Sequence, residues 1–315
     1  MQRRTCLKTM LAGASAIALP AAAQQSLNGR IKHTDPSEYK LSRSHDSAGD
    51  MACQEPSLVV SSDMTTNLGF IDRCQITPGG GVGHHFHNHC EEMFVIFNGE
   101  AQFTIDGRTS LVKSPAGAPC RMGHSHAIYN PTDKPVEFMN INVTAVKGRY
   151  DAYNLGDARV NVPLDPIPVF MTMHLDRTVR QPSEPNLPNE VEDEPHMPLQ
   201  PVENYLGGHG TIQYCRRLHP EVFLTNWSYV DHLVLPPGTS EGRHLHVGVE
   251  EVYYVMSGSG EVQVKEETST VRKGDAVPVL IDEVHAFRNN GTQDLELMII
   301  GIAVQKWVLD TREVK

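Results

Sequence analysis

Three histidines and one glutamate occur twice in this sequence with the same spacing. The first set is His85, His87, Glu92 and His126, and the second set, 159 residues further along the chain (244 − 85), is His244, His246, Glu251 and His285. Imidazole nitrogens combined with one carboxylate oxygen suit a divalent transition metal and leave coordination positions open for water or substrate. A repeat that keeps four metal-binding residues in register predicts one metal centre in each half of the chain.

In each half, the first two histidines are separated by a single residue. Side chains i and i+2 of a β-strand lie on the same face, so His85 and His87 are expected to project together, as are His244 and His246. The glutamate begins the next apolar segment and the third histidine comes from a later one. The donor set suits Mn, Fe, Ni, Cu or Zn, so we expect one such divalent ion per half and leave its identity open.

Short apolar segments that end at turn residues surround both sets. They end at Pro78-Gly79, Asn98-Gly99 and Asp106-Gly107 in the first half, and at Pro237-Gly238 and Ser257-Gly258 in the second. Strands that recur at about eight- to twelve-residue spacing with such turns predict an antiparallel barrel or jelly roll.

These residues resemble the two motifs of the cupin family. The first motif, G(X)5HXH(X)3-4E(X)6G, is matched from Gly79 to Gly99 and again from Gly238 to Gly258. The second, G(X)5PXG(X)2H(X)3N, is matched in part around His126 and His285. The resemblance to a bicupin implies an all-β fold of two tandem cupin-type double-stranded β-helix (jelly-roll) barrels.

The second motif departs from the family pattern at four turn positions. Pro115 and Arg121 replace its first glycine and its proline in the first half, and Leu280 and Asp282 replace its proline and internal glycine in the second. None of these positions is a metal ligand, so the departures concern loop shape rather than metal binding.

Composition changes along the chain predict five segments. We expect a signal peptide at 1–23, an irregular N-terminal arm at 24–55, cupin barrel 1 at 56–147, a connector with a Pro-rich acidic linker at 148–203, and cupin barrel 2 at 204–315. The linker prediction rests on the density of Pro, Glu and Asn between residues 181 and 201.

The N-terminus has the pattern of an export signal. Arg3-Arg4 precedes a short apolar segment that ends at Pro20 and Ala21-Ala22-Ala23. The paired arginines favour a twin-arginine signal over an ordinary Sec signal, and the apolar segment is too short for a stable membrane anchor. We therefore expect a periplasmic or secreted protein. The formal net charge of −11 argues against nucleic acid as a partner.

Cysteine positions allow two disulfides in the mature chain. Cys53–Cys74 and Cys90–Cys120 are the pairs considered, and an odd number of cysteines leaves at least one unpaired.

Four side chains are candidates for catalysis: Glu92, Glu251, Tyr253 and His124. The two glutamates could act as bases by loosening from the metal, which is an expectation from the family. Tyr253 shares the inward face of Glu251 and could donate a phenolic hydrogen bond. His124, with His84 and His89, could transfer protons, since imidazole titrates near neutrality.

Two further pairs of residues have alternative interpretations. Glu91 and Glu250 should point away from the metal, but each would become the ligand if the register shifted by one residue. Arg73 and its counterpart His232 could anchor a substrate carboxylate or make an ordinary contact between strands.

The exported bicupin pattern is similar to that of manganese-containing oxalate decarboxylases. In that family an arginine stands three residues before the first metal histidine, where this chain has Val82 and Glu241. Without the arginine a small dianion loses its charge-assisted anchor, so oxalate chemistry becomes the minority interpretation.

The leading functional hypothesis is therefore a metal-dependent oxidoreductase, a dioxygenase that acts on a small organic molecule. A metal-dependent lyase, isomerase or decarboxylase of a small acid or sugar is the first alternative, because the same ion can act as a Lewis acid. A non-catalytic periplasmic protein that binds a metal or small ligand is the second. The partners expected are a small-molecule substrate and the twin-arginine or Sec export machinery; a homo-oligomer is left open.

Overall fold

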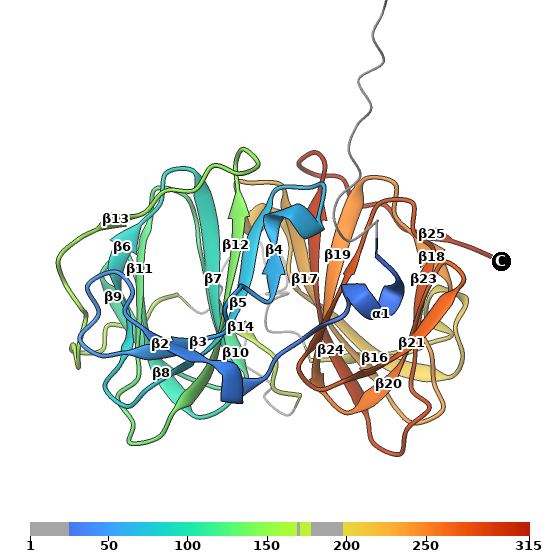
Figure 1. Ribbon diagram of the computed structural model, residues 1–315, viewed down its shortest axis with the longest axis horizontal. Helices are drawn as coiled ribbons and strands as arrows, with labels where there is room; N and C mark the ends of the chain where they lie inside the picture. Colours follow the sequence, from blue (N-terminus) through green and yellow to red (C-terminus); the bar gives the residue numbers. More distant parts are fainter. Residues whose placement is uncertain (1–24, 169–170, 178–197) are drawn as a thin grey trace, which may run out of the picture.

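The computed structural model describes residues 25–168, 171–177 and 198–315. Two β-barrels lie side by side (Figure 1), and each is built from a large antiparallel sheet and a five-stranded sheet. The predicted all-β fold of two tandem jelly-roll barrels is confirmed. The predicted signal peptide and most of the predicted linker lie outside the described residues.

Barrel 1 is formed by the first half of the chain. Its large sheet has the order β14-β10-β7-β12-β5-β3-β2, with β4 also paired to β5. These strands are β2 (Lys40–Ser42), β3 (Met51–Cys53), β4 (Val59–Val60), β5 (Leu68–Ile76), β7 (Cys90–Ile96), β10 (Ala116–Cys120), β12 (Val136–Thr144) and β14 (Met173–His174). The second sheet, in the order β13-β6-β11-β8-β9, contains β6 (Gly81–Phe86), β8 (Glu100–Ile105), β9 (Arg108–Lys113), β11 (Ser125–Tyr129) and β13 (Tyr153–Asn154).

Barrel 2 repeats this arrangement. Its large sheet, β1-β22-β19-β24-β17-β16-β15, contains β1 (Lys32–His33), β15 (Gln200–Glu203), β16 (Thr211–Leu218), β17 (Trp227–Leu235), β19 (Val249–Ser257), β22 (Asp275–Val279) and β24 (Leu295–Ala303). The second sheet, β21-β20-β23-β18-β25, contains β18 (His244–Leu245), β20 (Ser259–Val264), β21 (Glu267–Arg272), β23 (His285–Arg288) and β25 (Arg312–Glu313).

Within residues 25–168, 171–177 and 198–315, the helical elements are short. They are α1 (Leu27–Arg30) and the 3₁₀ segments η2 (Pro36–Glu38), η3 (Ser61–Asp63), η6 (Tyr205–Gly207) and η7 (Pro220–Val222). Within the described ranges, no helix has the length and apolar character needed to cross a membrane.

The two barrels share a hydrophobic core between their large sheets. One cluster of buried side chains includes Ile71 and Ile141 from barrel 1 together with Trp227 and Ile300 from barrel 2. Burial of apolar surface is the main favourable term in such an association, so the barrels form one packed body.

Two carboxylates make reciprocal contacts across this shared core. Glu91 of β7 accepts backbone N–H bonds from Leu224 (2.8 and 3.0 Å) and Thr225 (2.8 Å) of barrel 2. Glu250 of β19 accepts the equivalent bonds from Thr65 (2.8 and 3.1 Å) and Thr66 (2.8 Å) of barrel 1. Both glutamates therefore point away from the metal centres, and neither is the alternative ligand considered from the sequence.

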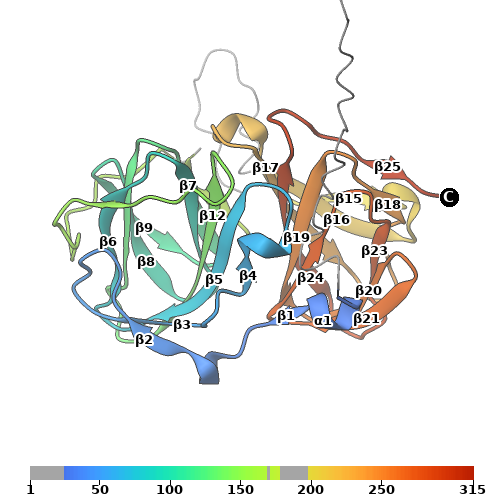
Figure 2. The ribbon, with the colours of Figure 1, turned by 45° about the horizontal axis from the view of Figure 1, so that its top comes forward.

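The N-terminal arm is more ordered than its sequence suggests, and it contacts both barrels (Figures 1 and 2). β1 pairs with β22 of barrel 2, and a buried ion pair joins Arg30 to Glu283 at 2.5 Å. Further along, β2 and β3 extend the large sheet of barrel 1. These strands are two or three residues long and partly exposed, which is too short to show the alternation that identifies strands in a sequence.

One of the two considered disulfides is present. Cys53 of β3 is bonded to Cys74 of β5, which attaches the arm covalently to barrel 1. Cys90 and Cys120 are buried and are not bonded to each other.

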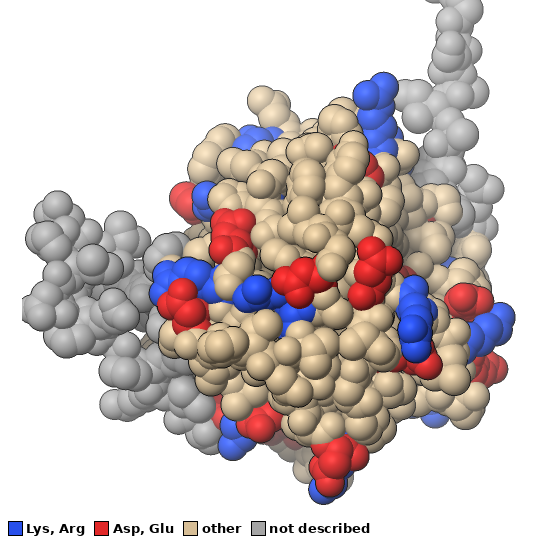
Figure 3. All heavy atoms as spheres, turned by 90° about the vertical axis from the view of Figure 1, so that its left-hand side faces the viewer, with Lys and Arg blue, Asp and Glu red and all other residues tan. Residues whose placement is uncertain are grey.

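Charges of both signs are mixed on the outer end of barrel 1. Figure 3 shows Lys and Arg side chains interspersed with Asp and Glu on this face, separated by uncharged surface. Because neighbouring charges alternate in sign, this face has no extended field of one sign.

Candidate metal centres

The four predicted ligands of barrel 1 converge at one buried point. His85 lies on β6, His126 lies opposite it on the paired strand β11, and Glu92 comes from β7 in the other sheet. His87 follows β6 directly. The candidate ligand atoms all lie within 4.8 Å of one another. We call this group the barrel 1 centre.

The four predicted ligands of barrel 2 converge in the same way. His244 on β18 is paired with His285 on β23, His246 follows β18, and Glu251 comes from β19. Their candidate ligand atoms also lie within 4.8 Å of one another, and none of the eight residues in the two centres exposes more than 4% of its surface. We call this group the barrel 2 centre.

Backbone carbonyls fix the histidine rings so that Nε2 faces inward. Nδ1 of His85 donates to the Gly83 carbonyl at 2.7 Å, and Nδ1 of His244 donates to the Gly242 carbonyl at 3.0 Å. His285 makes the same bond to Glu283 at 2.9 Å. A neutral imidazole that donates through Nδ1 has a lone pair on Nε2, which is the state a metal ligand needs.

The second histidine of each pair is held by the chain segment that follows the last long strand of its barrel, β12 or β24. Nδ1 of His87 donates to the backbone carbonyl of Asp151, and Nδ1 of His246 donates to that of Asp310. Asp310 follows Asp151 by the same 159 residues, so the supporting segment is duplicated together with the ligands.

The closest contact within the barrel 1 centre joins two ring nitrogens. Nε2 of His85 lies 3.0 Å from Nε2 of His126. Because the Nδ1 bond of His85 leaves a lone pair on its Nε2, a positive charge between the rings would stabilise this arrangement. Nε2 of His87 is 3.5 Å from Glu92, and Nε2 of His246 is 3.2 Å from Glu251.

The carboxylate ligand is supported differently in the two barrels. Glu92 accepts hydrogen bonds from the side-chain amides of Asn140 (3.1 Å) and Asn142 (2.9 Å). Glu251 instead accepts them from the phenols of Tyr229 (2.7 Å) and Tyr253 (3.1 Å). The duplicated glutamates are therefore held by different hydrogen-bond donors. Such donors change the basicity of the ligand and, through it, the properties of the bound ion.

The pKa values of the histidines show how each buried carboxylate acts on its neighbours. Burial lowers the pKa of His85 and of His244 to about 3, so both are neutral. Burial would also lower the pKa of His87, but its contacts with Cys90 and Glu92 raise that pKa to about 11. In barrel 2 the charge of Glu251 overcomes the effect of burial and raises the pKa of His246 to about 9. Each carboxylate thus attracts a positive charge into a buried site.

The residues present fit the expected ion. Three borderline nitrogen donors and one hard oxygen suit a divalent transition metal, and their supporting hydrogen bonds are already formed. Each barrel therefore contains one three-histidine, one-glutamate metal-binding site.

One histidine beside the barrel 1 centre was not predicted from the sequence. The ring of His45, in the N-terminal arm, stacks on the ring of His85 with centroids 3.7 Å apart and planes 8° apart. Its Nδ1 donates to the side-chain oxygen of Asn154 at 2.8 Å, and the amide of Asn154 donates to Asp46 at 3.0 Å. No spacing marks His45, because it lies outside the cupin motifs.

In the structure, Leu206 takes the place in barrel 2 that His45 has in barrel 1. Both have a left-handed backbone, with φ of +52° and +53°. A Cβ atom on Gly83 would lie 1.7 Å from the His45 carbonyl oxygen, and one on Gly242 would lie 1.8 Å from that of Leu206. The backbone arrangement is thus duplicated, but only barrel 1 has an imidazole there.

Of the residues considered from the sequence, Tyr253 lies beside the ligands of barrel 2, where it donates to Glu251. His124 does not lie among the ligands: its side chain is 44% exposed and pairs with Asp106 at 2.5 Å, so its catalytic role stays a prediction. Arg73 donates to the Phe138 carbonyl at 2.7 Å and packs over Phe97 between the barrels.

The remaining candidates also have other partners. His232 pairs with Glu296 at 2.7 Å and accepts a hydrogen bond from Arg217, so it does not reach a substrate at the metal. Nε2 of His84 contacts the Ser125 hydroxyl at 2.9 Å on the rim of barrel 1.

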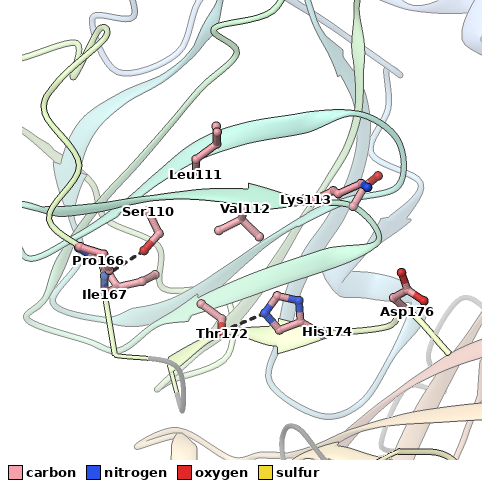
Figure 4. Close-up of a pocket in the computed structure, with 10 residues that line it drawn as sticks. Ser110, Leu111, Val112, Lys113, Pro166, Ile167, Thr172, His174 and Asp176 are labelled. Carbon is pink, nitrogen blue, oxygen red and sulfur yellow. Dashed lines mark hydrogen bonds between the residues drawn. The ribbon is translucent and has the colours of Figure 1, made fainter. Parts of the chain in front are cut away.

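A separate surface pocket of about 360 Å³ lies beside β9 and β14 (Figure 4). On one side the backbone N–H of Ile167 donates a hydrogen bond to the Ser110 hydroxyl, and on the other the Thr172 hydroxyl contacts the ring of His174. None of the eight metal ligands lines it.

Single ligand substitutions should separate the two ions. His87→Ala should lower the metal content from about two ions per chain to about one, and His246→Ala should do the same, because each variant removes a donor from one barrel only. Elemental analysis of the purified variants measures this. His124→Ala, the control, should retain both ions. Unchanged metal content in both ligand variants would contradict the assignment.

Comparison with known proteins agrees with this geometry. A cupin domain model matches residues 72–142 and 231–301, one match in each barrel. An oxalate-binding protein of Thermotoga maritima is 29% identical over 99 residues, which cover 31% of this chain and 82% of that protein.

Solved oxalate decarboxylases have a similar two-barrel fold. The Lactobacillus farciminis enzyme in complex with formate has a TM-score of 0.56 at 17% identity, covering 90% of this chain and 88% of that one. The Bacillus subtilis enzyme at pH 4.6 has a TM-score of 0.55 at 16% identity, covering 90% and 78%. A further Bacillus subtilis structure is described by its Mn(II) centres. At these identities the likeness shows the fold alone: two tandem barrels of the cupin type, each matched in part by the cupin domain model and each with one metal-binding site.

Proposed function

We propose that this protein is a metal-dependent enzyme that decarboxylates a small carboxylic acid. The observation that carries the proposal is the convergence of three imidazoles and one carboxylate at an enclosed point in each of two cupin barrels. The resemblance to oxalate decarboxylases and to an oxalate-binding protein supports a small acid as the substrate. It favours the decarboxylase alternative over the dioxygenase that the sequence placed first.

The charge balance of barrel 1 favours an acid as its ligand. A divalent ion and the single carboxylate of Glu92 leave one net positive charge in a buried site. Val82, three residues before His85, is apolar and supplies no charge of its own. A substrate carboxylate would therefore be attracted by the ion rather than by an arginine.

The chain's own residues hold the site in place. Asn140 and Asn142 orient Glu92, backbone carbonyls orient His85 and His87, and burial excludes bulk water. When bound, the ion supplies Lewis acidity that polarises the substrate carboxylate. Decarboxylation breaks one C–C bond, releases CO₂ and leaves the electron pair of that bond on the remaining carbon, which takes up a proton; for hydrogen oxalate that proton is the substrate's own, and the products are formate and CO₂.

Oxalate and a panel of small mono- and dicarboxylic acids provide the direct test. The protein loaded with Mn²⁺ should release CO₂ from at least one of them without net oxygen uptake, whereas the metal-free protein should not. Gas-phase CO₂ analysis and an oxygen electrode measure the two quantities. Oxygen uptake in proportion to product would support a dioxygenase instead. Binding without turnover of any acid would support a ligand-binding protein.

His45 is the side chain most suited to contact a substrate in barrel 1. His45→Ala should lower kcat by about tenfold or more, within the range for a positioned proton-transfer group, while the metal content stays unchanged. Leu206→Ala is the matched control, because it truncates the equivalent side chain in barrel 2. Steady-state kinetics measures kcat, and elemental analysis measures the metal content. An equal loss of kcat in both variants would show that packing, not the imidazole, is responsible.

We also propose that the protein acts outside the cytoplasm. The signal pattern of residues 1–23 supports this, and so does the Cys53–Cys74 disulfide, since such bonds persist in oxidising compartments.

A charge-conserving change tests the export route. Replacing Arg3 and Arg4 together with Lys should leave unprocessed protein in the cytoplasm if the twin-arginine route is used. An ordinary Sec signal would tolerate the change, because the positive charge is kept. Mass spectrometry of periplasmic and cytoplasmic fractions distinguishes these outcomes. The mature chain should begin near Gln24, and cytoplasmic retention of the wild-type chain would overturn the proposal.

A further inference from the structure

Barrel 2 contains a buried carboxylate that the ligand set does not include. Glu241 lies three residues before His244 and exposes 3% of its surface. One carboxylate oxygen, Oε1, lies 3.9 Å from Nε2 of His244. The other, Oε2, is buried and has no hydrogen-bond partner. The side chain therefore reaches the ring nitrogen that a metal ion would bind.

A carboxylate in such a position needs a positive partner. Charged groups removed from water are found paired with an opposite charge or bound to a metal. Arg216 could have supplied this charge, but its guanidinium is bonded to Asp231 at 2.8 and 3.0 Å and packs over the ring of Tyr229. An ion bound at Nε2 of His244 would supply a positive charge adjacent to Glu241.

Barrel 1 shows that the fold does not require this carboxylate. The equivalent residue, 159 positions earlier, is Val82, which is as buried as Glu241. The eight ligands are otherwise the same in type and order. The difference between Val82 and Glu241 therefore changes the charge of one centre while leaving its ligand set intact.

We propose that Glu241 is a further ligand for the ion of barrel 2, so that this centre has three histidines and two carboxylates. Two carboxylates neutralise a divalent ion, whereas the single carboxylate of barrel 1 leaves one positive charge. Tyr229 and Tyr253 donate hydrogen bonds to Glu251 beside it, one to each carboxylate oxygen. Barrel 2 then retains its ion tightly and has no net positive charge to attract small acids, whereas barrel 1 keeps one.

Metal retention tests this without any assay of activity, so its result is independent of the proposed reaction. In a His87→Ala background only barrel 2 binds an ion, and its affinity for Mn²⁺ can be measured by competition with a fluorescent chelator. Glu241→Gln should weaken Mn²⁺ binding at least about tenfold, because one charged ligand is lost. Glu266→Gln, which removes the same charge from an exposed position, should leave the affinity unchanged.

The reciprocal change examines the same idea in barrel 1. In a His246→Ala background, Val82→Glu should strengthen Mn²⁺ binding, since it gives barrel 1 the second carboxylate.

The proposal would be overturned if, in the His87→Ala background, Glu241→Gln bound Mn²⁺ with an affinity within twofold of that of the His87→Ala parent.

A measurement on the unmodified chain covers the case in which a variant fails to fold. The fully loaded protein should release Mn²⁺ to excess chelator in two phases of equal size, one fast and one slow. In the His246→Ala variant only the fast phase should remain. Release from both barrels at one rate would contradict a difference in charge between the centres.

Discussion

The opposite faces of one β-strand connect each metal centre to the interface between the barrels. On β7, Glu92 points into barrel 1 and the preceding Glu91 points out to the backbone of Leu224 and Thr225 in barrel 2. On β19, Glu251 and Glu250 do the same in the opposite direction. A shift of one residue would move one carboxylate of each strand into the place of the other and put Cys90 or Met93, or on β19 Val249 or Val252, in the vacated place, so either the inter-barrel contact or the metal ligand would be lost. The register of these two strands is therefore fixed by both requirements at once.

Within that fixed register, the two copies keep the ligands and differ in what surrounds them. Amides of Asn140 and Asn142 support the carboxylate in barrel 1, and phenols support it in barrel 2. At the positions of Tyr229 and Tyr253, barrel 1 has Phe70 and Phe94, and Phe94 stacks on His126 at 4.3 Å. An apolar ring cannot donate to the carboxylate, so each copy needs its own set of donors. The pattern indicates two centres of one origin with different chemical properties.

The sequence predicts the ligands and the fold because both rest on local spacing. An i, i+2 histidine pair and a constant offset of 159 residues identify strands, faces and repeats without any knowledge of distant contacts. The arm could not be predicted, because β1, β2 and β3 are stabilised by pairing with residues far along the chain. For the same reason the choice between Cys53–Cys74 and Cys90–Cys120 stayed open. Glu241 was noticed only as the absence of an arginine, since the sequence does not show which buried polar atoms lack partners.

His45 shows how a structural requirement and a chemical one can be separated. A left-handed backbone at a residue other than glycine is strained, and such strain often marks functional sites. Here Leu206 has the same conformation against Gly242 that His45 has against Gly83, and Leu206 has no chemically reactive group. The close approach to the glycine therefore explains the strain in both barrels. What the fold leaves unexplained is the imidazole itself, its stacking on His85 and its bond to Asn154, and these are the features that distinguish the barrel 1 centre.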